Sequence, residues 1–137
     1  MSELILVRGL PGSGKSTLSK KLAAVMNANH YEADQYFITD GVYKFDINYI
    51  VEAHEWCQDS TRKSLDSGTS VIVSNTFTTR RELFPYFYMA AEFGIVPQIV
   101  LCQGQWGSIH GVPEETLERM KNRFQFDVSD LYGEDYV

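Results

Sequence analysis

A run of nine residues, Gly9 to Thr17, matches the pattern GxxxxGK[ST] and joins a short apolar run to a helical pattern. Its glycines allow backbone N–H groups to turn inward around phosphate oxygens, and the positive end of the following helix points at the same place. Lys15 can reach the β- and γ-phosphates of a nucleoside triphosphate, and the Ser16 hydroxyl is the expected Mg²⁺ ligand. The predicted nucleotide-binding residues are Gly9, Gly12, Ser13, Gly14, Lys15, Ser16 and Thr17.

The match is specific because its context fits as well as its letters. With ordinary residue usage, a chance match in a chain of 137 residues has odds on the order of one in two hundred. The motif also requires a strand before it and a helix after it, and the sequence predicts both. A glycine turn that binds nothing is the alternative interpretation.

A carboxylate is the second group that phosphoryl transfer needs, because the acceptor hydroxyl must be oriented and must lose its proton. Asp34 is the best candidate, since it is predicted to end the second strand at the same sheet edge as the phosphate-binding loop. It would act as the general base or, as a variant, hold a water on Mg²⁺. The alternative is a structural role in which the carboxylate caps a turn.

The elements that must position these residues alternate between short apolar runs and helical patterns, which is typical of an α/β fold. Strands separated by helices need crossover connections, so we predict a three-layer fold with a parallel sheet of four or five strands and helices on both faces. Residues 35–46 have no clear period and are predicted to form a loop. Predicted strands cover residues 3–7, 30–34, 70–74 and 95–102, and predicted helices cover residues 15–27, 47–65, a stretch with Pro85 in its first turn that ends at Gly94, and residues 113–125.

Length and charge limit the class of protein. A chain of 137 residues with 44% hydrophobic residues corresponds to one folded domain, 1–137. A net charge of −6 argues against a broad basic face for duplex nucleic acid or lipid, but it is compatible with a local basic cleft, since residues 126–137 form an acidic tail. The N-terminal apolar run is too short for a signal peptide or membrane span, and Cys57 and Cys102 lack metal-site spacing. We therefore expect a cytoplasmic protein without membrane, zinc or disulfide partners.

Several motifs together resemble one group of kinases. They are the phosphate-binding loop, the segments 33–36, 71–76 and 110–113, and Met120 with Arg123. The combination is similar to the polynucleotide 5′-hydroxyl kinase group of P-loop kinases, in particular its small ATP-binding domains of the AAA and zeta-toxin type. The resemblance covers nearly the whole chain and implies ATP-dependent transfer to a hydroxyl, with Asp34 as the base. It also implies that residues 103–123 form a lid that closes on the donor phosphates, in which His110 is a candidate nucleotide contact.

The chain departs from that group's pattern at two catalytic positions. The acid that usually ends the third strand is replaced by Ser74 and Asn75, neither of which carries charge. The arginine that usually precedes the His-Gly-Val-Pro segment is missing, and arginines aimed at the transferring phosphoryl group are worth ~10³ to 10⁵ in rate. Either Arg119 or Arg123 supplies this cation from the lid, or both are ordinary surface residues.

The leading hypothesis is an ATP- and Mg²⁺-dependent kinase that acts on a polynucleotide 5′-hydroxyl or a nucleotide-like acceptor. Arg80 and Arg81 either hold an acceptor phosphate or form a solvated pair. Phe37 stands where phage-type enzymes have an arginine for the substrate phosphate, so nucleic acid as the acceptor stays open. One alternative is a weakened ATP- or GTP-binding module that works as a switch or interaction protein, and another is simple NTP hydrolysis. The predicted catalytic residues are Lys15, Asp34, Arg119 and Arg123.

Overall fold

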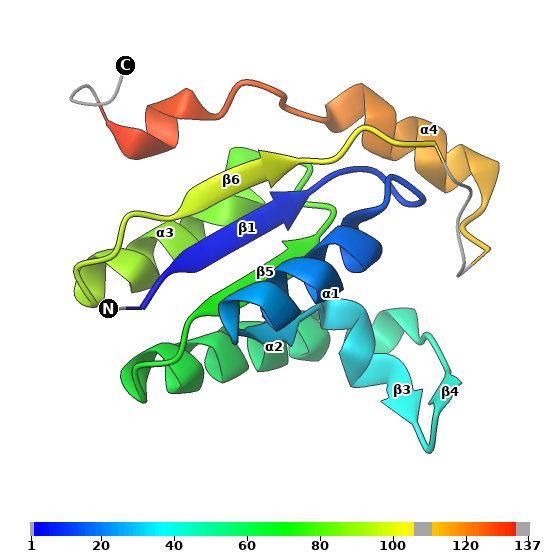
Figure 1. The fold of residues 1–137 in the computed structure, drawn as a ribbon. Helices are drawn as coiled ribbons and strands as arrows, with labels where there is room; N and C mark the ends of the chain where they lie inside the picture. The colour runs from blue at the N-terminus through cyan, green and yellow to red at the C-terminus, as the bar shows by residue number, and fades with distance from the viewer. Residues whose placement is uncertain (1, 106–110, 134–137) are drawn as a thin grey trace.

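The computed structural model describes residues 2–105 and 111–133, and its centre is a parallel sheet. The strands are β1 (Leu4–Arg8), β2 (Asn29–Tyr31), β5 (Val71–Asn75) and β6 (Gln98–Leu101), in the order β2-β5-β1-β6. β1 lies in the middle, where Leu6 is opposite Val73 on one side and Ile99 on the other. The strands run in the same direction, so their carboxyl ends form a single edge (Figure 1). This confirms the predicted α/β class with a four-stranded sheet.

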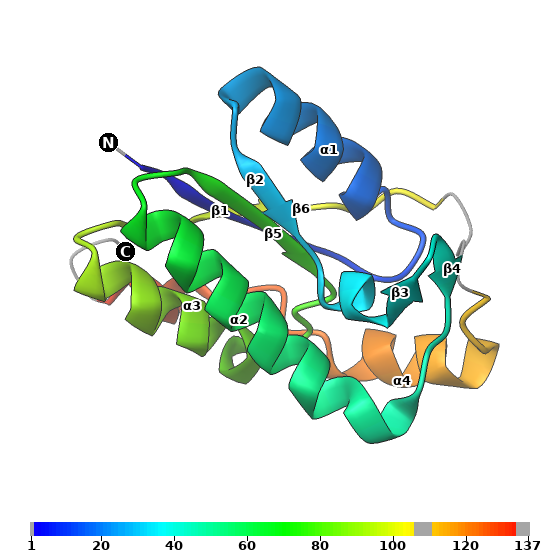
Figure 2. The ribbon, with the colours of Figure 1, turned by 90° about the horizontal axis from the view of Figure 1, so that it is seen from below.

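Helices cover both faces of the sheet (Figure 2). Helix α1 (Lys15–Met26) packs its Leu18 and Leu22 against Ile5 of β1 and its neighbours on one face. Helices α2 (Ile50–Asp66) and α3 (Arg80–Glu92) cover the other face, where Cys57, Leu83 and their neighbours meet the remaining side chains of β1 and β5. Because both faces are buried, β1 and β5 are buried along their whole length, which explains their continuous apolar runs. The predicted three-layer arrangement is confirmed.

The segment between β2 and α2 is more ordered than the predicted loop. It contains a 3₁₀ helix η1 (Ala33–Phe37), a hairpin of β3 (Ile38–Thr39) and β4 (Val42–Tyr43), and a second 3₁₀ helix η2 (Ile47–Tyr49). Asp40 and Gly41 form the hairpin turn with φ of 52° and 77°, the left-handed conformation that two-residue hairpins need and that Asp-Gly favours. The loop prediction was wrong because these elements are two to five residues long, too short to show a period in the sequence.

The second strand is shorter than predicted, ending at Tyr31 instead of Asp34. The chain turns after Glu32, since the backbone N–H of Gln35 donates to the Glu32 carbonyl at 3.0 Å. The N–H of Ala33 donates to the side-chain oxygen of Asn75 at 2.9 Å, so it is not available for a strand ladder. Asp34 therefore lies in the first turn of η1.

Helices α2 and α3 differ from their predictions in detail. The apolar spacing of positions 47, 50, 51, 57 and 65 predicts one buried helical face. Cys57 and Leu65 are buried against the sheet as predicted, whereas Ile47, which lies in η2, and Val51 are 65% and 62% exposed. Ala53 is buried against Ala33 and Phe37 of η1. Helix α3 begins at Arg80 after Thr79, whose backbone N–H donates to the Glu82 carboxylate at 2.9 Å in a capping box. Pro85 thus lies inside α3 and not in its first turn.

The chain beyond helix α4 (Glu114–Arg123) is held to the sheet by hydrogen bonds from a buried arginine of β1. Arg8 is 1% exposed and donates to the carbonyl of Phe77 at 3.0 and 2.7 Å and to that of Gln125 at 2.7 Å. Its guanidinium lies 4.3 Å from the ring centroid of Phe124. A 3₁₀ helix η3 (Ser129–Tyr132) follows, with the Tyr132 hydroxyl donating to the Pro97 carbonyl at 2.6 Å. No helix in residues 2–105 and 111–133 is long and apolar enough to cross a membrane.

Candidate active site

The phosphate-binding loop connects the carboxyl end of β1 to α1, as the motif predicts. The N–H of Gly9 donates to the carbonyl of Thr76 at 3.2 Å, which ties the start of the loop to the chain after β5. A methyl group on Gly9 would lie 2.5 Å from both the Cys102 carbonyl oxygen and Ser13 Oγ, so only glycine fits there. Gly14 has φ of 94° and is the N-cap of α1, which begins at Lys15. The loop thus presents its backbone N–H groups and the helix N-terminus on the carboxyl edge of the sheet.

Two side chains of the loop, Lys15 and Ser13, have donors that could bind a phosphate. Lys15 Nζ donates to the Leu10 carbonyl at 3.0 Å, and burial lowers its pKa, against the charges of Glu32, Cys102 and Asp34, which raise it. Ser13 Oγ is buried and has no hydrogen-bond partner among the described residues. An orphaned hydroxyl beside a partly desolvated ammonium fits a bound phosphate chain.

Glu32 is a site residue that the sequence analysis missed. Its Oε1 accepts a hydrogen bond from Ser74 Oγ at 2.7 Å and lies 3.1 Å from His30 Nε2, which is itself 2.8 Å from Ser74 Oγ. A further hydrogen bond joins Glu32 to Ser16 of the phosphate-binding loop. Burial alone would raise the pKa of Glu32, but the hydrogen bonds from His30, Ser16 and Ser74 lower it to about 2. An ionised carboxylate therefore stands beside the expected metal ligand.

Asp34 lies on the same side of the site. Its charge acts on Lys15, and its Oδ1 accepts a hydrogen bond from the Tyr43 hydroxyl of the β3–β4 hairpin at 3.3 Å. Burial, together with the charge of Asp34 and this bond, raises the pKa of Tyr43 to about 12. Tyr43 therefore stays a hydrogen-bond donor at neutral pH and orients the carboxylate.

The two uncharged residues at the end of β5 have structural partners. Asn75 accepts from the N–H of Ala33 and donates to Cys57 Sγ at 3.8 Å, which fixes the start of η1. Ser74 donates to Glu32. Both residues thus hold the chain that carries the two carboxylates.

The arginines of α4 are exposed. Arg123 Nε donates to Thr78 Oγ1 at 3.1 Å, and Arg119 donates to Thr116 Oγ1 of its own helix at 3.1 Å. Both α4 and the β3–β4 hairpin lie at the edge towards which the strands point (Figures 1 and 2). His110 and the adjoining part of the predicted lid, residues 106–110, lie outside the described residues.

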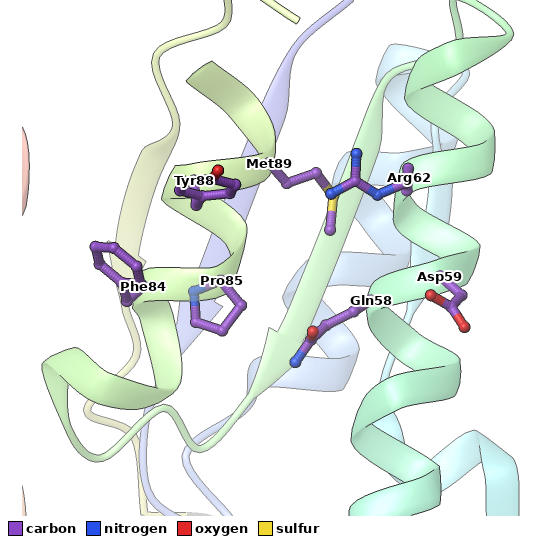
Figure 3. Close-up of a pocket in the computed structure, with 7 residues that line it drawn as sticks. All are labelled: Gln58, Asp59, Arg62, Phe84, Pro85, Tyr88 and Met89. Atoms are coloured by element: carbon purple, nitrogen blue, oxygen red, sulfur yellow. The ribbon is translucent and has the colours of Figure 1, made fainter. Parts of the chain in front are cut away.

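Two hollows lie between α2 and α3. The smaller, about 210 Å³, is lined by His54, Asn75 and Arg81 among others, so it opens beside the carboxyl end of β5. The larger, about 410 Å³, lies farther along the helices and is lined by Arg62, Phe84 and Pro85 among others (Figure 3). Arg62 is paired there with Glu92 at 2.6 Å. Pro85 lines both hollows.

Comparison with known proteins agrees with this geometry. A protein-family model described as AAA domain matches residues 4–111, which include the phosphate-binding loop, Glu32 and Asp34. The chain belongs to this family. The AAA domain described here is of the small ATP-binding P-loop kinase type.

Individual proteins resemble this chain in sequence or in fold. The AAA domain is 33% identical to NEDD4-binding protein 2 of Homo sapiens over 92% of this chain, but it spans only 8% of that protein. A chain of the Pnkp1/Rnl/Hen1 RNA repair complex shares the fold with a TM-score of 0.68 and 19% identity, over 91% of this chain and 44% of that one. The APS kinase CysC of Mycobacterium tuberculosis, with AMPPNP and APS bound, shares it with a TM-score of 0.58 and 18% identity, over 96% and 71%.

The site can also be tested for its fit to Mg²⁺. Mg²⁺ takes oxygen ligands and keeps several waters, so one or two protein oxygens beside the phosphates suffice. The Ser16 hydroxyl and the Glu32 carboxylate are such oxygens, and a hydrogen bond from Ser16 contributes to the lowered pKa of Glu32. In residues 2–105 and 111–133, no group of three or more His, Cys, Asp or Glu side chains forms a separate metal site. Two protein oxygens fit a magnesium ion whose other ligands are phosphate oxygens and waters.

Proposed function

We propose that this AAA domain is a phosphotransferase that moves the terminal phosphoryl group of ATP to a hydroxyl, with Mg²⁺ as cofactor. The observation that carries the proposal is the position of Asp34, whose carboxylate lies within electrostatic reach of Lys15 in the phosphate-binding loop. A carboxylate facing the cradle of the transferred group can accept the proton of an acceptor hydroxyl. Mg²⁺ bound at Ser16 would neutralise charge on the donor phosphates.

Each residue then has a defined task. Lys15 holds the β- and γ-phosphates, with the glycine-rich loop around them and Ser13, Ser16 and Thr17 at its helical end. Asp34, oriented by Tyr43, receives the acceptor proton at a carboxylate oxygen. Arg119 and Arg123 of the lid, residues 103–123, approach the donor phosphates when the lid closes and excludes water, and His110 contacts the nucleotide.

The proposed acceptor is a polynucleotide 5′ end or a nucleotide-like molecule. The smaller hollow beside β5 supports this choice, because it places Arg81 and His54 next to Asn75, which in turn holds η1 with Asp34. Arg81 would bind an acceptor phosphate, whereas Arg80 is engaged with Asp130 at 2.8 Å. The likeness to a chain of an RNA repair complex supports the same acceptor class.

The test is phosphoryl transfer from labelled ATP to a panel of 5′-hydroxyl oligonucleotides, 5′-phosphorylated oligonucleotides and nucleosides. We expect Asp34→Asn to lower the transfer rate by about 10² to 10⁴, the usual contribution of a general base, while ATP affinity changes little. Asp40→Asn, in the exposed hairpin turn of the same segment, is the matched control and should keep the wild-type rate. Undiminished transfer by Asp34→Asn would remove the base assignment.

A second candidate function follows from the missing lid arginine and the uncharged end of β5. Without a cation on the transferring group, the domain would bind ATP or GTP and act as a switch or interaction module. Nucleotide binding by calorimetry with no product on any acceptor would favour that module. Phosphate release without any acceptor would instead indicate simple NTP hydrolysis.

A further inference from the structure

The sheet places Glu32 and Ser74 side by side at the ends of two neighbouring strands. The last register pair between β2 and β5 is Tyr31 with Val73, and Glu32 and Ser74 each follow one residue later. Adjacent strands are about 4.8 Å apart, so a carboxylate on Glu32 can occupy space beside the end of β5. The hydrogen bond of 2.7 Å between Ser74 Oγ and Glu32 Oε1 shows that it does so. The side chain of Glu32 is only 15% exposed.

The hydrogen bonds around Glu32 run in one direction. The Ser74 hydroxyl donates its proton to Glu32, so its oxygen is left to accept from His30 Nε2 at 2.8 Å. A hydrogen bond from Ser16 to the same carboxylate also lowers the pKa of Glu32. Glu32 accepts in each case and is held as an oriented anion.

The hydrogen bond with Ser16 connects the Glu32 carboxylate to the expected Mg²⁺ ligand. A hydroxyl that coordinates a cation through its oxygen must direct its proton elsewhere, and the neighbouring Glu32 carboxylate can accept that proton. Mg²⁺ keeps several waters, and these waters need acceptors on the protein side. A carboxylate in contact with the metal-ligating hydroxyl is the natural acceptor.

We infer that Glu32 positions the hydrated Mg²⁺ of the nucleotide complex, and that it does so from the end of β2 in place of the acid missing from the end of β5. Ser74 is then the anchor of the relocated acid. The inference rests on the proposed Mg²⁺–ATP ligand but on no acceptor and no transfer step. It separates the two carboxylates of the segment by role, with Glu32 serving the metal and Asp34 serving the acceptor.

The alternative to a role in Mg²⁺ binding is a purely structural role for Glu32. In that case its hydrogen bonds would do no more than hold β2 against β5 and keep the segment that carries Asp34 in place. Loss of a purely structural contact would lower ATP affinity equally in the presence and absence of Mg²⁺. The discriminating quantity is therefore the gain in ATP affinity that Mg²⁺ produces, which is independent of turnover.

The experiment is calorimetric titration of the full chain with ATP, once in Mg²⁺ and once in EDTA. We expect Mg²⁺ to tighten binding to the wild type, and Glu32→Gln to lose about tenfold or more of that gain, as second-layer metal partners typically do. Affinity in EDTA should stay within about twofold. Glu3→Gln, an exposed glutamate before β1 at the opposite end of the sheet, is the matched control and should behave as wild type.

A swap variant tests the relocation itself. Glu32→Ser combined with Ser74→Asp returns the acid to the end of β5, and we expect it to recover most of the Mg²⁺-dependent gain. Ser74→Ala keeps the Glu32 carboxylate and removes the hydroxyl that orients it, so it should lose part of the Mg²⁺-dependent gain in ATP affinity. It provides a second measurement if a thermal melt shows that Glu32→Gln is poorly folded. The full Mg²⁺ gain in Glu32→Gln, or an equal loss of affinity in Mg²⁺ and in EDTA, would overturn the inference.

The outcome can be distinguished from failure of the proposed function. A wild type that binds Mg²⁺–ATP through Glu32 but transfers nothing to any acceptor contradicts the phosphotransferase and leaves this inference intact. A wild type whose ATP affinity does not respond to Mg²⁺ contradicts the inference, whatever the transfer assay shows.

Discussion

At the residue scale, the carboxylate of Glu32 has the environment that differs most from that of an ordinary glutamate. It is nearly buried, yet hydrogen bonds from His30, Ser16 and Ser74 hold its pKa at about 2. A folded-state pKa below the unfolded value of about 4.5 means that the ionised form stabilises the fold. This stabilisation is complete above pH 4.5 and is lost as the pH falls towards 2.

We therefore predict an acid-dependent loss of stability that depends on Glu32. Urea unfolding between pH 5.5 and 2.5 should show the free energy of unfolding of the wild type falling, with on the order of 3 kcal/mol coming from this group. Glu32→Gln should be less stable than the wild type at neutral pH and should show a shallower decline with acid. Equal slopes for the two proteins would show that Glu32 does not hold this bonded, ionised state.

The residues differ in how far the sequence could identify them. The phosphate-binding loop is contiguous, so spacing alone predicted Lys15 and Ser16 and the strand and helix around them. Glu32 depends on partners from β2, β5 and α1, and no local pattern reports that meeting. Asp34 is predicted from its expected place at the end of the second strand, but β2 stops at Tyr31 and the 3₁₀ helix η1 carries Asp34.

At the element scale, helix α4 is fixed at its C-terminal end. Besides the bonds from Arg8, the N–H of Gln125 donates to the Thr78 carbonyl at 2.7 Å, and the N–H of Arg80 donates to Gln125 Oε1 at 2.8 Å. None of the side chains in α4 itself is fully buried. A helix fastened at one end with little packing along its length is suited to pivot about that end, which is what a lid requires.

We predict that Arg8 is the main fastener of this end. Arg8→Met should destabilise the protein by about 2 to 4 kcal/mol, because the carbonyls of Phe77 and Gln125 lose their buried donors. Amide hydrogen exchange at Gln125 should accelerate as well. Arg119→Met, on the exposed side of α4, is the control and should change stability by less than about 0.5 kcal/mol. Unchanged exchange at Gln125 in Arg8→Met would mean that the backbone bonds suffice without the guanidinium.

The sequence predicted the order and type of the main elements because the buried strands and amphipathic helices carry clear periods. It could not predict the role of Arg8, since an arginine that ends a strand looks like a surface residue until the chain after α4 covers it. The predicted buried face of the second helix was right at Cys57 and Leu65 but wrong at Ile47 and Val51, which are exposed.

At the scale of the whole molecule, charge is unevenly distributed. The net charge is −6, yet Lys15 and Arg81 both lie towards the carboxyl edge of the sheet, and part of the acidic C-terminal segment packs against α3 through η3. A domain with this balance cannot attract nucleic acid through a broad field. If its acceptor is a polynucleotide, a few local contacts must hold the strand.

We therefore predict that oligonucleotide binding depends weakly on salt and that one phosphate contact comes from Arg81. For a single strand, each neutralised phosphate contributes about −0.7 to the slope of log affinity against log salt, so a slope of about −1 to −2 is expected. Arg81→Gln should reduce that slope by about 0.7 for a 5′-hydroxyl oligonucleotide. Arg62→Gln removes the same charge from the neighbouring hollow, where Arg62 is paired with Glu92, and should leave the slope unchanged. Fluorescence anisotropy from 50 to 300 mM salt measures all three proteins, and an unchanged slope in Arg81→Gln would exclude the smaller hollow as the place where the acceptor phosphate binds.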